Sequence, residues 1–94
     1  MTPPARVQAA IELLDAIILA ARDGGAAADT LIARYFKTRR YAGSKDRRAV
    51  RALVYDAIRH FGKRPASGRA AILGLARARP ELREAFDGGA HGPA

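Results

Sequence analysis

The segment 45–61 carries apolar residues at the spacing of an α-helix and basic residues on the opposite side. Ser44 is suited to cap the start of this helix, Asp46 complements the helix dipole in the first turn, and Gly62 stops the helix. The pattern predicts a long amphipathic helix with one face turned to a core. The expected core positions are Val50, Leu53, Val54, Ala57, Ile58 and Phe61.

Four more helical segments are expected around this helix, at about residues 4–22, 27–38, 68–77 and 81–86. Thr2 and Ser67 are suited as N-caps, Gly24-Gly25 ends the first helix, and Pro80 opens the last one. Leu19 falls among polar residues and is expected to contact a partner or another helix. The expected inward-facing residues are Val7, Ala10, Ile11, Leu14, Ile17, Ile18, Ala21, Leu31, Ile32, Tyr35, Phe36, Ala71, Ile72 and Leu75.

The chain of 94 residues has the length of one domain and the composition of a helical one. Aromatic residues make up only 6% and tryptophan is absent, while alanine, arginine and leucine are frequent. We therefore expect an all-α fold, a small helical bundle of about five helices over residues 1–86. A disordered Gly/Ala tail is expected at 87–94, because this segment has nothing to bury.

Several classes of protein are excluded by what the sequence lacks. Cysteine is absent, which rules out disulfides, thiolate metal sites and cysteine nucleophiles and fits a reducing compartment. No apolar run approaches the roughly 20 residues of a membrane span. Glu12 and Asp15 interrupt the N-terminal apolar stretch, which argues against a signal peptide. We expect a cytoplasmic protein without a membrane segment.

The net charge of +8 is concentrated in one third of the chain. Residues 34–69 contain twelve Lys and Arg against two acids, a balance of +10, whereas residues 1–33 sum to −2 and residues 70–94 to zero. Codon bias can explain why arginine outnumbers lysine, but it does not explain this clustering. A localised positive field attracts polyanions, of which phosphate backbones are the commonest.

The basic block suggests a nucleic-acid surface. Arg48, Arg51 and Arg59 share with Tyr55 a sector of about 80° on the outer side of helix 45–61. Arginine donates paired hydrogen bonds to phosphate, and a tyrosine ring can stack on an unpaired base. A merely solvated face, with Tyr55 as a half-buried spacer, is the alternative. With two flanking basic loops, the candidate binding residues are Arg39, Arg40, Lys45, Arg48, Arg51, Tyr55, Arg59, Lys63 and Arg64.

The sequence offers no good constellation for catalysis. The histidines are His60, beside the core face of its helix, and His91, in the tail. Ser44 and Ser67 are explained as helix caps, and no acid–histidine pair is placed near either. Histidines and carboxylates are too sparse for a metal site, and no Gly-rich phosphate loop is present. We therefore expect a protein that is not an enzyme by itself and needs no cofactor or metal.

Residues 43–59, GSKDRRAVRALVYDAIR, resemble the Asp-Arg…Leu-Val-Tyr-x-x-(Ile/Leu)-Arg helix of NusB-like domains. The likeness is closer to the N-terminal domain of bacterial ribosomal RNA cytosine-5 methyltransferases (the RsmB/Sun family) than to the free transcription antitermination factor. Residues 4–15, PARVQAAIELLD, look like the first helix of those enzymes. The resemblance spans roughly residues 2–77.

This resemblance implies an all-α fold and an RNA-binding or RNA-positioning role. It also implies that Asp46 caps its helix and that Arg47 reaches towards a neighbouring helix. The later helices of a NusB-like domain have no counterpart here, so an incomplete version of the domain is expected. The methyltransferase part, with its S-adenosylmethionine loop and catalytic cysteines, is also missing. Asp56 stands where the family often has glycine, which argues against RNA approaching the backbone there.

Three functions are compatible with these observations. The first is an RNA-binding accessory module that helps to position ribosomal RNA. The second is protein interaction, either self-association or docking to a methyltransferase catalytic domain, because missing helices leave apolar surface exposed. The third is DNA binding by a helix-turn-helix. The six-residue loop 39–44 argues against it, because that motif uses a turn of about 3–4 residues.

Overall fold

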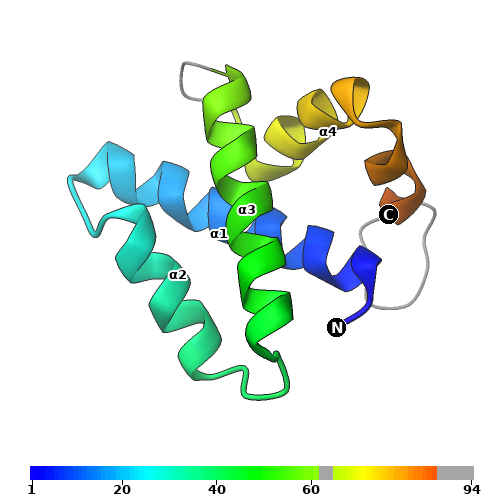
Figure 1. The fold of residues 1–94 in the computed structure, drawn as a ribbon. Coiled ribbons are helices and arrows are strands. Elements are labelled where there is room, and N and C mark those ends of the chain that lie inside the picture. Colours follow the sequence, from blue (N-terminus) through cyan, green and yellow to red (C-terminus); the bar gives the residue numbers. More distant parts are fainter. Residues whose placement is uncertain (62–64, 87–94) are drawn as a thin grey trace.

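A computed structural model describes residues 1–61 and 65–86 of the chain. Over these residues the chain forms five helices and no strand, which confirms the expected all-α bundle. Four are α-helices and the last is a 3₁₀-helix (Figure 1): α1 (Pro3–Asp23), α2 (Ala28–Lys37), α3 (Ser44–Phe61), α4 (Gly68–Ala78) and η1 (Pro80–Phe86). The expected tail at 87–94 lies outside the described residues.

The central element is α1, against which each of the other four helices packs. In Figure 1, α3 crosses α1, while α2 and α4 lie on either side of α3. Because helices pack on several sides of α1, more residues of α1 are buried than the one apolar face that the sequence predicts. Ala9 and Leu13 are therefore also fully buried. Ala21, an expected core residue, is exposed because the last turn of α1 lies beyond the crossing with α3 (Figure 1).

Side-chain and glycine caps end the helices largely where the sequence predicts. Thr2 Oγ1 accepts a hydrogen bond from the Ala5 N–H at 3.2 Å, and Ser67 Oγ accepts one from the Ala70 N–H at 3.1 Å. Gly24 ends α1 with φ at 67°, a left-handed conformation that glycine adopts without steric cost. These local signals therefore set the bounds of α1 and the start of α4.

The start of α3 differs from the expectation by one residue. Ser44 is the first helical residue, and the Gly43 carbonyl before it accepts the first helical hydrogen bond, from the Arg47 N–H at 3.0 Å. The Asp46 carboxylate, three residues on, accepts the Gly43 N–H at 3.1 Å. The capping group is therefore Asp46, as the family resemblance implied, and the prediction of Ser44 as the cap was wrong.

The apolar face of α3 is covered over only part of its length. Val50, Val54 and Ala57 are fully buried, as expected. Ile58 is 37% exposed, so its assignment to the core was wrong. Crossed helices touch over only a few turns, which leaves apolar positions far from the crossing less covered. Leu19 of α1 is 60% exposed and is not covered by any described helix.

A close approach of backbones joins α1 to α4. The Gly68 N–H donates to Asp15 Oδ1 at 2.6 Å. A Cβ atom on Gly68 would lie only 2.2 Å from the Ile11 carbonyl oxygen, so only glycine fits there without a shift. Ile72 and Leu75 then enter the core as expected. This contact holds the beginning of α4 close against α1.

Candidate nucleic-acid interface

A basic groove of about 630 Å³ lies between α2 and α3. Ile32 and Phe36 of α2 form apolar parts of its wall, and Asp29 is the one acid in its lining. Five cations against this carboxylate give a formal balance of +4, which is the arrangement a polyanion requires. The cations come from both helices and the loop between them: Lys37, Arg40, Arg47, Arg48 and Arg51.

Four of the five cations have no carboxylate partner in the part of the chain that the structure describes. Arg47 and Arg48 donate through Nε to main-chain carbonyls, at 3.2 and 3.4 Å, which leaves their other N–H groups available. The side chains of Lys37 and Arg40 make no hydrogen bond or ion pair with any described residue. The Arg47 guanidinium carbon lies 6.0 Å from the centre of the Phe36 ring in α2, the neighbouring-helix contact that the resemblance implied.

Carboxylates partly neutralise the basic residues on the outer side of α3, which the sequence predicts as a binding surface. Asp29 accepts hydrogen bonds from the Tyr55 hydroxyl and from Arg51 Nη2, the latter at 3.3 Å. Asp56 pairs with Arg59. The hydrogen bond to Asp29, followed by partial burial, raises the pKa of Tyr55 above its usual value. Tyr55 is thus a half-buried, bonded side chain, as in the alternative given above. Exposed ion pairs of this kind contribute little stability, so their side chains can readily exchange partners.

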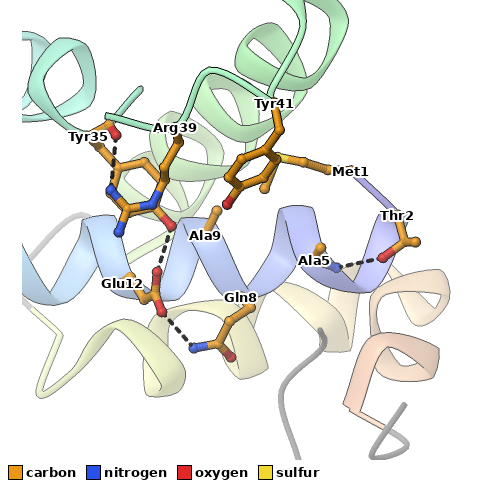
Figure 2. A pocket seen from close by; sticks show the side chains of 9 residues that line it. All are labelled: Met1, Thr2, Ala5, Gln8, Ala9, Glu12, Tyr35, Arg39 and Tyr41. Carbon is orange, nitrogen blue, oxygen red and sulfur yellow. Dashed lines mark hydrogen bonds between the residues drawn. The ribbon is translucent and has the colours of Figure 1, made fainter. Parts of the chain in front are cut away.

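A second groove of about 690 Å³ lies against the N-terminal half of α1 (Figure 2). The Arg39 guanidinium carbon lies 3.6 Å from the centre of the Tyr35 ring, and the Tyr35 hydroxyl donates to Glu12 Oε1 at 2.5 Å. Burial, and next the bond to Glu12, raise the pKa of Tyr35 well above its usual range. Tyr41 lines the same groove and is 72% exposed. This groove therefore combines aromatic rings with one cationic side chain and one carboxylate.

The structure separates the predicted binding residues. Arg40, Arg48 and Arg51 lie together in the basic groove, whereas Arg39 lines the second groove. Lys45 is exposed at the start of α3 and lines neither groove. Arg59 and Tyr55 lie further along α3, and Lys63 and Arg64 fall outside the described residues. The expected binding residues of α3 and its flanking loops thus do not form one surface, and three of them lie in the groove between α2 and α3.

Sequence reasoning missed two cations of the basic groove, Lys37 and Arg47. Lys37 lies on α2, whereas the predicted binding residues belong to α3 and its flanking loops. The family resemblance implies a structural role for Arg47, so Arg47 is not among the predicted binding residues. The available signal was the density of basic residues from position 37 to 48. That density indicates a basic surface but does not show which helix faces supply it.

The described residues show no metal cluster and no paired histidine. Within residues 1–61 and 65–86, no three His, Asp or Glu side chains gather in a way that could hold a metal ion. His60 is exposed, packs its ring edge against Phe61 at 5.5 Å, and has no carboxylate partner among these residues. Across the same ranges, no helix has both the length and the apolar character to cross a bilayer.

Comparisons of this chain with protein-family models, with curated proteins and with solved structures find no match. The charge and geometry of the two grooves are therefore the basis on which a function can be inferred.

Proposed function

We propose that the protein is an RNA-binding accessory module, not catalytic by itself, whose groove between α2 and α3 holds RNA phosphates. The observation that carries this proposal is the gathering of five cations in one groove, four of them without a carboxylate partner among the described residues. Guanidinium groups donate paired hydrogen bonds to phosphate oxygens. Unpaired positive charges in a concave site also focus the field and attract a polyanion from a distance.

RNA is a better candidate than duplex DNA. Six residues, 38–43, connect α2 to α3, which is longer than the tight turn of a helix-turn-helix. The resemblance of residues 43–59 to NusB-like domains of the RsmB/Sun family favours ribosomal RNA as the ligand. Asp46 caps α3 and Arg47 lies beside Phe36, as the resemblance implies for these two residues.

The test is a fluorescence-anisotropy titration of a labelled ribosomal RNA hairpin at several salt concentrations. We expect log affinity to fall with log salt by about 0.7–0.9 per phosphate contacted. The double variant Lys37→Glu/Arg40→Glu should bind far more weakly and with a shallower salt slope. The matched control is Arg77→Glu/Arg83→Glu, which changes the net charge equally at exposed residues of α4 and η1.

Equal RNA affinity of these two double variants would contradict the proposal, because it would show that net charge alone governs binding. Absence of salt-sensitive RNA binding in the wild type would contradict it as well. Tighter binding to duplex DNA than to RNA of equal charge would instead favour a helix-turn-helix function. Circular dichroism of each variant shows whether the helices are retained.

Protein association is the second candidate function. Leu19 and Leu73 are 60% and 41% exposed, and a third groove, of about 640 Å³, is lined in part by Val7, Leu53 and Leu82. A second copy or a methyltransferase catalytic domain would cover such surface. Sedimentation velocity over a concentration series tests self-association, and a strict monomer at high concentration would argue against it.

A further inference from the structure

The two grooves differ sharply in charge. The basic groove has five cationic side chains against one acid, whereas the second groove has one cationic side chain, Arg39, and one carboxylate, Glu12. A phosphate gains little from this site, because Glu12 offsets the only cationic side chain and the Met1 ammonium group is already paired with Asp46. The second groove is therefore suited to a planar, uncharged, hydrogen-bonding group.

We propose that the second groove receives one unpaired base of the bound RNA and favours a base with an exocyclic amino group, such as cytosine. This inference rests on the proposed function, because the base belongs to the strand whose phosphates lie in the basic groove. It goes beyond that function by assigning a base-binding site to residues of α1 and of the loop 38–43.

Tyr41 supplies the stacking surface. Its ring borders the groove near Ala9 and the side chain of Met1 (Figure 2). It is 72% exposed and makes no hydrogen bond within residues 1–61 and 65–86. A large aromatic side chain in this position contributes little to the core but offers its face to a base, and base–aromatic stacking is tolerant of sequence.

Glu12 supplies the selectivity for an amino group. Its carboxylate is oriented by the Tyr35 hydroxyl on Oε1, at 2.5 Å, and more loosely by Gln8 Nε2 on Oε2, at 3.4 Å (Figure 2). An ionised carboxylate has about four lone-pair sites, so it can still accept further hydrogen bonds. Carboxylates accept from the N4 amino group of cytosine, whereas uracil presents a carbonyl oxygen at that position.

The chain itself connects the two grooves. Arg39 lines the second groove and Arg40 lines the basic groove, although the two residues are consecutive. The loop 38–43 therefore contributes an arginine to each groove, from two Cα atoms that are about 3.8 Å apart. We expect a strand whose phosphates contact Arg40 to place a neighbouring base against Tyr41, the next residue of this loop.

The experiment compares binding of single-stranded oligo(C) and oligo(U) of equal length, which carry the same phosphate charge. Wild type should prefer oligo(C). Tyr41→Ala should weaken oligo(C) binding about five- to a hundredfold without changing the salt slope, because a stacked base is lost and no phosphate contact is. Tyr41→Phe keeps the ring and should bind nearly as wild type does.

Glu12→Gln tests the selectivity separately. It should lower the ratio of oligo(C) to oligo(U) affinity, whereas the same charge change at the exposed Glu84, in Glu84→Gln, should leave the ratio unchanged. Unchanged affinity of Tyr41→Ala, or no preference for oligo(C) in the wild type, overturns the base site. The proposed function still stands in that case if Lys37→Glu/Arg40→Glu abolishes salt-sensitive binding. Absence of all RNA binding by the wild type overturns both.

Discussion

The carboxylate of Asp46 accepts hydrogen bonds from three separate parts of the chain. Arg6 of α1 donates through Nε at 2.9 Å, the Met1 amino group at 3.1 Å, and the Gly43 N–H at 3.1 Å. The bonds from Arg6 and Met1, and next that from Gly43, lower the pKa of Asp46 to about 2. One side chain thus ties the beginning of α1 to the beginning of α3.

Acid should weaken the fold through Asp46. Its folded pKa of about 2 lies below the ordinary value of 3.8, so its stabilising contribution is complete above about pH 4 and is lost as the pH falls towards 2. Asp46→Asn should be less stable than wild type at pH 7 and should show a flatter fall in urea midpoint between about pH 4 and 2. Glu84→Gln, at an exposed site, is the control. An equally steep fall in Asp46→Asn would show that other groups are responsible.

Among the helices, the contact between α1 and α4 depends on Gly68, which has no side chain. Gly68→Ala should destabilise the protein by about 1–3 kcal/mol, because the added Cβ meets the Ile11 carbonyl oxygen and must push the helices apart. Gly25→Ala is the control, since its Cβ would lie an ordinary 3.4 Å from the Ala20 Cβ. Urea unfolding measures both. If Gly25→Ala lowered the free energy of unfolding as much as Gly68→Ala does, the close approach of α1 and α4 would not explain the effect.

Local signals in the sequence were sufficient to predict the helices. Thr2, Ser67 and Gly24 act within a turn of their own position, so their capping roles were predictable. Ser44 was misassigned because the acid that reaches back, Asp46, competes for the same helix start. Ile58 was misassigned because a periodic pattern identifies an apolar face but does not show how far a crossing helix covers it.

The basic surface was predictable, but its division into two grooves was not. The density of charge between residues 34 and 69 indicated where a polyanion would bind. The directions taken by Arg39 and Arg40 depend on the loop between α2 and α3, which no periodic pattern describes. Asp29 lies more than twenty residues before Arg51 and Tyr55 in the sequence, so only the tertiary fold reveals that they are partners.

The whole molecule is small, and a domain of this size is stabilised by only about 5–15 kcal/mol. Leu13 is buried in the central helix, so Leu13→Ala should cost about 2–5 kcal/mol and lower the melting temperature by more than about 10 °C. Leu19→Ala, on the same helix but 60% exposed, should change stability by less than about 0.5 kcal/mol. Similar melting temperatures of the two variants would contradict the central position of α1.

The net charge of +8 should also be visible in the stability of the free protein. Cations gathered without partners repel one another, so the melting temperature should rise with sodium chloride between about 0.05 and 0.5 M as the repulsion is screened. Lys37→Glu/Arg40→Glu should show a smaller rise, because it removes repulsion in the basic groove. Arg77→Glu/Arg83→Glu is again the control, and an equal rise in both variants would contradict a local origin.

The ammonium group of Met1 has a practical consequence for anyone who purifies this protein. Fusing an affinity tag ahead of it, or acetylating it, turns a cation into a neutral amide, so the ion pair with Asp46 is lost. The added residues would also stand at the edge of the cavity shown in Figure 2, which Met1 helps to line. A purification tag or dye attached to Met1 is therefore expected to disturb both this ion pair and the second groove.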